Sequence, residues 1–148
     1  MTQIAKTEAK AEIKSSPVKV FDFLKYNLNQ FLHMFPQAFK KVELLEGEEG
    51  QAGNVRLLEY ALGNEPMTAK VKTEAINEDE KSITFIPIEG EIMRIYTTFV
   101  AKVTVGDGYV MWSIEYEKAN DSVPNPDSYA KLAAQITKGL DAYLCTQI

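Results

Sequence analysis

The feature that most constrains the fold is a run of six strand-like segments followed by one long amphipathic helix. Apolar residues alternate with polar ones, and turn residues separate the segments, at 39–46, 54–61, 67–76, 81–88, 92–105 and 109–118. The turns include Gly63-Asn64, Asn77-Glu78-Asp79-Glu80 and Gly106-Asp107-Gly108. Because these connections are too short for crossovers, we expect consecutive hairpins in an antiparallel sheet. Pro87 has no N–H for a ladder, which predicts a bulge or a strand end there.

The final helix begins with Asn125 as N-cap and Pro126 at the first helical position. Its apolar face is formed by Tyr129, Leu132, Ala133, Ile136, Leu140, Tyr143 and Leu144. At the other end of the chain, residues 4–14 alternate small or apolar side chains with charged ones, which predicts a half-buried strand. Ser16-Pro17 then starts two short helices that break near Tyr26-Asn27 and end at Pro36.

This order of elements predicts an α+β fold. A seven-stranded curved antiparallel sheet wraps one long C-terminal helix, and two short helices follow the first strand. The length of 148 residues suits one domain over 1–148. Because one helix does not fill a wide curved sheet, we expect an internal cavity.

Composition excludes several classes of function. The net charge is −5, and Lys and Glu are interspersed, so no basic face for nucleic acid is present. No apolar stretch reaches the roughly 18 residues that span a membrane, and no apolar signal core opens the chain. A single cysteine, Cys145, forms no internal disulfide. We therefore expect a cytoplasmic protein with no membrane partner.

A loop with a glycine at every third position, Gly47, Gly50 and Gly53, resembles a phosphate-binding loop at first sight. No Lys-Ser or Lys-Thr follows it, its glutamates repel phosphate, and a strand rather than a helix comes next. The loop is instead expected to be a flap at the entrance of the cavity.

Several motifs occur in an order and spacing typical of one plant family. They are Leu45-Glu46-Gly47-Glu48-Glu49-Gly50 with Gly53, Ser82-Ile83-Thr84-Phe85 leading to Ile88-Glu89-Gly90, Trp112, Glu115-Tyr116-Glu117-Lys118, and Val123-Pro124-Asn125-Pro126. Over its whole length the chain resembles the major latex protein branch of the plant Bet v 1-type (birch-pollen-allergen, START-like) superfamily. The resemblance implies a helix-grip fold with a large apolar cavity for small hydrophobic ligands such as terpenoids, sterols, hormones or lipids. We expect no cofactor.

The sequence departs from this family at two positions. Glu49 stands where relatives often have a bulky aromatic residue, and Arg56 stands where the latex branch often has an apolar one. These two substitutions indicate a more polar loop and a cavity that is not purely apolar.

Strand alternation predicts which side chains face the cavity. The predicted ligand-binding residues are Arg56, Leu58, Tyr60, Met67, Ala69, Ile83, Phe85, Tyr96, Phe99, Val110, Trp112, Tyr116, Ile136 and Leu140. The inward face of strand 92–105 is ambiguous, because both of its faces are apolar.

Arg56 and Tyr60 are the main candidates for ligand chemistry. A guanidinium beside a phenol could hold a carbonyl, enolate or carboxylate oxygen; alternatively, Arg56 pairs with a nearby glutamate and only shapes the cavity mouth. Tyr96 offers either a ligand contact or a core aromatic with a satisfied hydroxyl. His33, the only histidine, does not share the apolar face of its helix, which favours a surface or rim position over a general base.

Three classes of function stay open on this sequence. The first is a binder of a small hydrophobic metabolite, with a role in defence or specialised metabolism. The second is a cofactor-independent enzyme that steers cyclisation or isomerisation of a reactive terpenoid or alkaloid intermediate. The third is a module that contacts other proteins through its surface. One His and one Cys do not supply a metal site, no Gly-x-Ser-x-Gly is present, and the oligomeric state, a monomer included, stays open.

Overall fold

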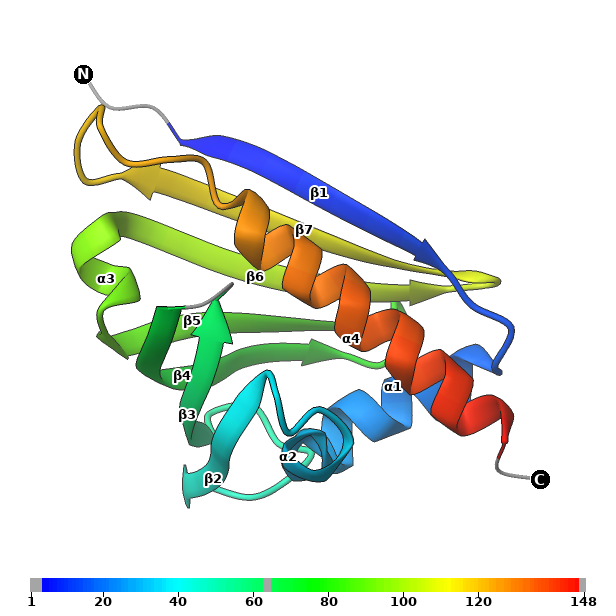
Figure 1. The fold of residues 1–148 in the computed structure, drawn as a ribbon. Coiled ribbons are helices and arrows are strands. Elements are labelled where there is room, and N and C mark those ends of the chain that lie inside the picture. Colours follow the sequence, from blue (N-terminus) through cyan, green and yellow to red (C-terminus); the bar gives the residue numbers. More distant parts are fainter. Residues whose placement is uncertain (1–3, 63–64, 147–148) are drawn as a thin grey trace.

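A curved antiparallel sheet and one long helix make up most of the molecule (Figure 1). The computed structural model describes residues 4–62 and 65–146. The strands are β1 (Ala5–Glu12), β2 (Phe39–Glu46), β3 (Val55–Leu62), β4 (Glu65–Asn77), β5 (Ser82–Gly90), β6 (Tyr96–Gly106) and β7 (Tyr109–Lys118). They are ordered β1-β7-β6-β5-β4-β3-β2, with antiparallel pairing throughout.

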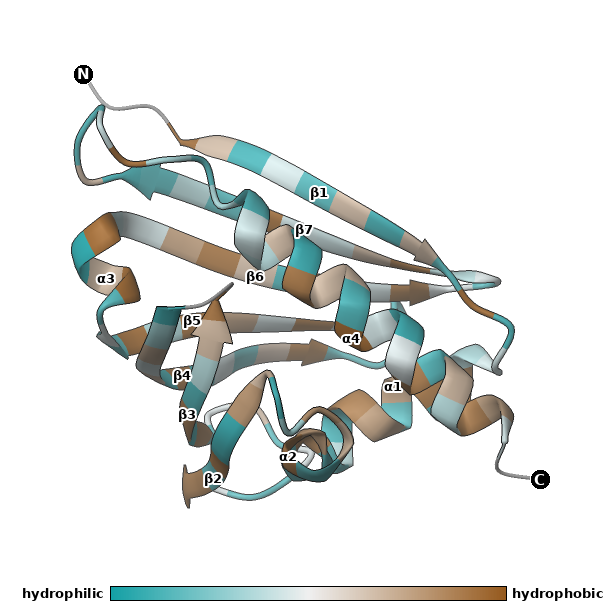
Figure 2. Cartoon of the chain, viewed as in Figure 1, coloured by the Kyte–Doolittle hydropathy of each residue, from teal (hydrophilic) through white to brown (hydrophobic). Residues whose placement is uncertain are grey.

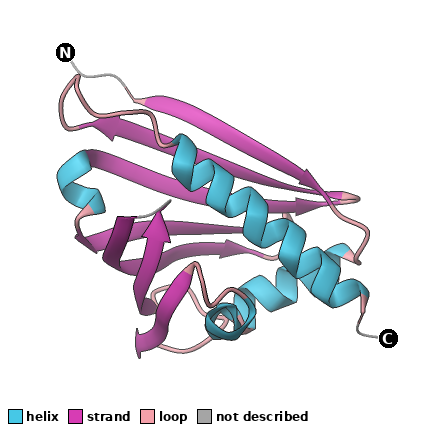
Figure 3. Ribbon diagram, viewed as in Figure 1, coloured by secondary structure: helices cyan, strands magenta, loops and turns pink. Residues whose placement is uncertain are grey.

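The helices are α1 (Pro17–Tyr26), the 3-10 helix η1 (Leu28–Gln30), α2 (Phe31–Met34), α3 (Ile92–Ile95) and α4 (Asp127–Cys145). The longest of them crosses the face of the sheet, as Figure 3 shows. Helix α4 runs across the sheet and contacts β1, β7 and β3, so it reaches from one edge strand to the far half of the sheet. The predicted fold class is confirmed.

One predicted strand is wrong at its beginning. The segment 92–105 was expected to be extended throughout, but its first residues form α3, and β6 begins only at Tyr96. The chain must turn between β5 and β6, and Gly90 makes this turn at φ +126°, close against the backbone of β4. Ile92 then fills the core from the helical turn. The predicted turn at Gly63-Asn64 lies outside the described residues.

The prediction for Pro87 is confirmed. Between β4 and β5 the register steps from Lys70 opposite Glu89 to Val71 opposite Pro87, which leaves Ile88 as the extra residue of a bulge. Pairing of β5 with β6 has already ended at Phe85. Pro87 therefore sits where only one neighbouring strand needs hydrogen bonds.

Helix α4 is held to the start of the chain at its C-terminal half. It begins at Asp127, with Pro126 rather than Asn125 as its N-cap residue. The Asp141 carboxylate accepts hydrogen bonds from the backbone N–H groups of Lys14 (3.0 Å) and Ser15 (2.9 Å). Burial alone would raise the pKa of Asp141, but these hydrogen bonds outweigh it and hold the pKa below its usual value. The two hydrogen bonds to Asp141 fix the turn of the chain between β1 and α1.

The core lies between α4 and the sheet. Figure 2 shows apolar and polar residues alternating along the strands, as expected for a sheet with one face buried and one in water. On α4 the buried residues are Ala133, Ile136, Thr137 and Leu140. Tyr143, predicted on the apolar face, is instead 42% exposed, although its ring packs edge-on against Phe23.

Candidate functional site: an apolar cavity between the sheet and the long helix

A cavity of about 190 Å³ lies between the middle of the sheet and α4. Its wall is almost entirely apolar. It is lined by Leu28, Phe31, Phe39, Val42, Arg56, Leu58, Tyr60, Ala69, Val71, Thr73, Phe85, Pro87, Ile92, Phe99, Ala101, Trp112, Ile114, Tyr129, Leu132, Ala133 and Ile136.

Strand register explains why these residues share one wall. Ala101 of β6 lies opposite both Phe85 of β5 and Ile114 of β7, so the three form one row across the sheet. Arg56 of β3 lies opposite Val71 of β4, and Leu58 lies opposite Ala69. Because side chains at positions i and i+2 of a strand share a face, these rows build a continuous surface beneath α4.

The structure brings together eight of the fourteen predicted ligand-binding residues around the cavity. These are Arg56, Leu58, Tyr60, Ala69, Phe85, Phe99, Trp112 and Ile136. The other six are buried in the core but do not line the cavity: Met67, Ile83, Tyr96, Val110, Tyr116 and Leu140. A side chain that faces the core therefore does not always line the cavity, because the cavity occupies only the middle rows of the sheet.

Sequence reasoning missed several lining residues. Thr73 continues the predicted inward face of Ala69 and Val71, and Ala101 continues that of Phe99, so strand alternation could have found both. Tyr129 was treated as part of the core face of the last helix. Its role at the cavity depends on how α4 crosses the sheet, which no local pattern specifies.

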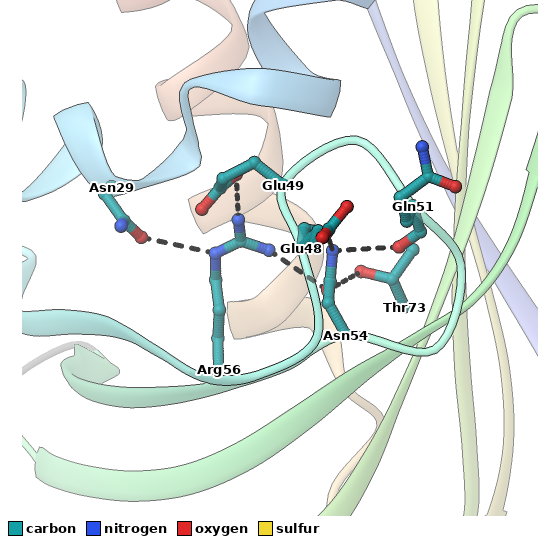
Figure 4. A network of polar contacts seen from close by, with 7 residues as sticks. All are labelled: Asn29, Glu48, Glu49, Gln51, Asn54, Arg56 and Thr73. Carbon is teal, nitrogen blue, oxygen red and sulfur yellow. Dashed lines mark hydrogen bonds and ion pairs between the residues drawn. The ribbon is translucent and has the colours of Figure 1, made fainter.

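Arg56 is 4% exposed, and its guanidinium is turned toward the glycine loop (Figure 4). Its Nη2 forms an ion pair with Glu49 Oε2. Nε donates to Asn29 Oδ1 at 3.3 Å, and Nη1 donates to Asn54 Oδ1 at 3.3 Å. Of the two arrangements considered for Arg56, the structure thus has the one in which a glutamate is its partner. The other oxygen of that glutamate, Glu49 Oε1, is buried and has no hydrogen-bond partner among the described residues.

Asn54 joins this ion pair to the backbone of the glycine loop. Its Nδ2 donates to the carbonyl oxygens of Glu48 (3.0 Å) and Gln51 (2.9 Å), and its Oδ1 also accepts from Thr73 Oγ1 at 2.7 Å. Asn54 is 2% exposed, and every polar atom of its amide is used (Figure 4). The loop is therefore fastened to β3 and β4 by a buried polar network.

Tyr60 and Tyr129 meet in the wall of the cavity. Their hydroxyl oxygens are 2.6 Å apart, and their rings pack edge-on with centroids 6.0 Å apart. Burial raises the pKa of both phenols, and the charge of Glu91 adds to this rise. Both hydroxyls are therefore neutral at physiological pH and act as hydrogen-bond donors and acceptors.

The remaining polar groups near the cavity are paired within the protein. Trp112 Nε1 donates to Thr137 Oγ1 at 2.8 Å, and this hydroxyl donates in turn to the Ala133 carbonyl. Beyond the cavity, Tyr96 donates to the Pro124 carbonyl at 2.9 Å and Tyr116 donates to Asn125 Oδ1 at 3.2 Å. Tyr96 thus has the satisfied hydroxyl of a core aromatic.

Other candidate groups lie away from the cavity. His33 is exposed on α2 and does not line it, and Cys145 is exposed near the end of α4. Within residues 4–62 and 65–146, no group of three or more His, Cys, Asp or Glu side chains is placed to hold a metal ion. Among the helices in the same residues, none is both long and apolar enough to cross a membrane.

A second, more polar hollow opens beside the cavity between the α2–β2 connection and α4. It has a volume of about 660 Å³ and is lined by Met34, Phe35, Pro36, Gln37, Ala38, Ala61, Ser128, Lys131, Leu132 and Gln135. Leu132 lines both hollows.

The chain is similar in sequence to plant proteins. A sequence model described as the pathogenesis-related protein Bet v 1 family matches residues 2–147. MLP-like protein 31 from Arabidopsis thaliana is 30% identical over 148 residues, which cover 96% of this chain and 86% of that protein. MLP-like protein 34 from the same organism is also 30% identical, and the chain spans 46% of its length.

The fold is also that of known structures. The crystal structure of major latex-like protein 151 from Panax ginseng superimposes with a TM-score of 0.90 at 30% identity, covering 95% of this chain and 97% of that one. Norcoclaurine synthase from Thalictrum flavum superimposes with a TM-score of 0.80 over 99% of this chain and 98% of that one, but at 16% identity it is similar in fold alone. On the agreement of family model, relatives and fold, this chain belongs to the Bet v 1 family, in its major latex protein branch.

Proposed function

We propose that this protein binds and carries a small hydrophobic plant metabolite of one-ring size, such as a monoterpenoid, in the cavity under α4. The observation that carries the proposal is the cavity itself: an apolar wall formed by the sheet and the helix. Apolar burial, about 25 cal/mol per Å² before ordering costs, supplies the driving force. Membership of a family whose fold binds such ligands supports the same function.

The volume of the cavity supports the small end of the ligand range. An engineered apolar cavity of about 150 Å³ is known to hold benzene, and typical ligand pockets measure about 300–1,000 Å³. At about 190 Å³, this cavity fits a one-ring molecule without rearrangement. A sterol or a long-chain lipid would require the wall to move.

The arrangement of polar groups favours a carrier over an enzyme. A catalyst for cyclisation or isomerisation needs donors or charges aimed at the reacting atoms. Here the guanidinium of Arg56 is bonded to Glu49, Asn29 and Asn54, and the indole N–H of Trp112 is bonded to Thr137. The neutral hydroxyls of Tyr60 and Tyr129 remain, and they bring no charge to a reacting atom. The similarity to norcoclaurine synthase extends to the fold alone and adds no catalytic residue.

Filling the cavity tests the proposal. Ala133 lines the cavity on α4, whereas Ala142 lies on the same helix and is exposed. We expect Ala133→Phe to weaken binding of limonene by tenfold or more, measured by displacement of an environment-sensitive dye, because the new ring occupies the ligand volume. The matched variant Ala142→Phe keeps wild-type affinity. Equal affinities in the two variants, with both folded by circular dichroism, would place the ligand elsewhere.

The carrier and the enzyme give different products. If the protein only carries its ligand, incubation with a reactive terpenoid or alkaloid intermediate leaves the ratio of products and stereoisomers as it is in buffer. A changed stereoisomer ratio, lost in Ala133→Phe, would establish the enzyme.

A further inference from the structure

The two hydroxyls of the Tyr60–Tyr129 pair carry one hydrogen more than the protein itself uses. Each phenol hydroxyl has one hydrogen to donate and two lone pairs to accept with. In the contact between Tyr60 and Tyr129, one hydroxyl donates and the other accepts. The accepting hydroxyl still has its own hydrogen, and no other acceptor bonds either tyrosine among the residues that the structure describes.

The other polar residues of the cavity wall have no comparable free hydroxyl or indole donor. Thr73 donates its hydroxyl to Asn54, and Trp112 donates to Thr137. Arg56 gives one N–H each to Asn29, Asn54 and Glu49, and these partners hold its guanidinium at the glycine loop. The remaining lining residues are apolar. One uncommitted hydroxyl hydrogen in an apolar wall is a specific feature, because a buried donor without an acceptor is unfavourable.

From this accounting we infer that the Tyr60–Tyr129 pair is a binding site for one uncharged acceptor oxygen of the ligand. The favoured ligand has a hydrocarbon body that fills the apolar cavity and one ketone, aldehyde or ether oxygen that accepts from the pair. This inference deepens the proposed function and rests on it.

The same surroundings select against a charged ligand oxygen. A carboxylate in this apolar wall would lose its hydration, and the nearest cation lining the cavity, Arg56, is already paired with Glu49. Both phenols stay protonated because burial raises their pKa, so the pair itself brings no charge. A neutral donor with a neutral acceptor is the combination that the cavity accommodates.

The pair predicts an unusual pattern of variants. Tyr60→Phe and Tyr129→Phe each remove one hydroxyl but leave the other with a free hydrogen. Only the double variant Y60F/Y129F removes every hydroxyl while keeping both rings. The effects of the two substitutions on an oxygenated ligand are therefore strongly non-additive.

Limonene and its ketone carvone are suitable probes, because they share a ring skeleton and differ in one oxygen. In Y60F/Y129F we expect carvone to bind about three- to tenfold more weakly, the worth of one hydrogen bond, while limonene affinity stays within twofold. At least one single variant keeps wild-type carvone affinity. The control Tyr116→Phe, whose hydroxyl bonds Asn125 away from the cavity, leaves the ratio of the two affinities unchanged. Thermal unfolding shows that each variant is folded.

Four results would overturn the inference while leaving the proposed function intact. The first is limonene binding without carvone binding in the wild type. In the double variant, equal losses for both ligands or an unchanged carvone affinity would overturn it. The fourth is full loss of carvone affinity in both single variants. Failure of the folded wild type to bind either probe would contradict the proposed function itself, and the inference with it.

Discussion

Arg56 occupies a position where burying a charged side chain is energetically unfavourable. It lies in the wall of an apolar cavity and is 4% exposed, so its charge depends on partners for stabilisation. Those partners come from three places: Glu49 in the glycine loop, Asn29 in η1 and Asn54 at the start of β3. The ion pair therefore connects the loop and the short helices to the sheet. Its role in the structure is to hold the end of the cavity together.

The ion pair predicts strong coupling between Arg56 and Glu49. Arg56→Met keeps much of the side-chain volume but leaves the Glu49 carboxylate unpaired, which we expect to cost about 2–3 kcal/mol of unfolding free energy. This is below the range for fully buried pairs, because the Glu49 side chain is 28% exposed. The double variant R56M/E49Q should be more stable than R56M alone, because it no longer buries a lone charge. Urea denaturation of R56M, E49Q and R56M/E49Q measures the coupling, and additivity of the two single substitutions within about 0.5 kcal/mol would contradict it.

The sequence was enough to single out Arg56 and Tyr60, but not to predict which residues they contact. Arg56 and Tyr60 were singled out because a guanidinium beside a phenol on the predicted inward face could hold a ligand oxygen. Their contacts were not predictable in detail. Tyr60 meets Tyr129 from a helix 69 positions away, and Arg56 meets Asn29 from 27 positions away. Such pairs depend on how distant elements pack, which strand alternation does not encode.

The glycine loop is an element whose shape depends on its glycines. Gly47, Gly50 and Gly53 all have positive φ, between +78° and +96°, where other residues are strained. Gly50 has a second requirement, because a Cβ there would lie 2.1 Å from Cε1 of Tyr26. At Gly53 a Cβ would meet nothing within 4 Å. The two positions therefore separate backbone strain from close packing against α1.

Alanine substitutions in this loop should reflect that difference. Gly53→Ala carries only the backbone cost, about 1–2 kcal/mol. Gly50→Ala should destabilise further, by about 1 kcal/mol, because the exposed ring of Tyr26 has to move away from its packing position. Adding Tyr26→Ala removes the clash, so G50A in that background should cost no more than G53A does in the wild type. Chemical denaturation of the four variants measures this, and an unchanged cost of G50A in the Y26A background would exclude the clash.

At the scale of elements, most boundaries followed from local chemistry. The bulge at Pro87 could be predicted because proline lacks an N–H. The predicted break near Tyr26-Asn27 also matches the end of α1 at Tyr26. Helix α3 could not, since Ile92 and Ile95 also fit an apolar strand. What makes this segment helical is the turn from β5 to β6 and the close approach of Gly90 to β4, and both are tertiary effects.

For the whole molecule, the volume of the cavity and its apolar wall have opposite effects on the preferred size of the ligand. The apolar wall favours large hydrophobic ligands, whereas the volume favours small ones. Each additional buried CH₂ contributes about 0.8 kcal/mol, so hydrophobicity alone favours a sterol over a monoterpene. A cavity of about 190 Å³ cannot accept a sterol unless packed side chains separate, and interiors packed like crystals resist this. The second hollow shares Leu132 with the cavity wall, but its lining is mixed in polarity and it does not extend the apolar wall.

A ligand series of increasing size decides which effect dominates. We expect limonene to displace the dye at lower concentration than a sesquiterpene, and a plant sterol not to displace it. The reason is that the closely packed wall limits the size of the ligand, although a larger ligand would bury more apolar surface. Ile136→Ala enlarges the cavity from α4 and should shift the preference toward the sesquiterpene, at a cost of about 2–4 kcal/mol in stability. If the sterol competes as well as limonene in the wild type, the wall opens on binding, and the volume of the empty cavity does not set ligand size.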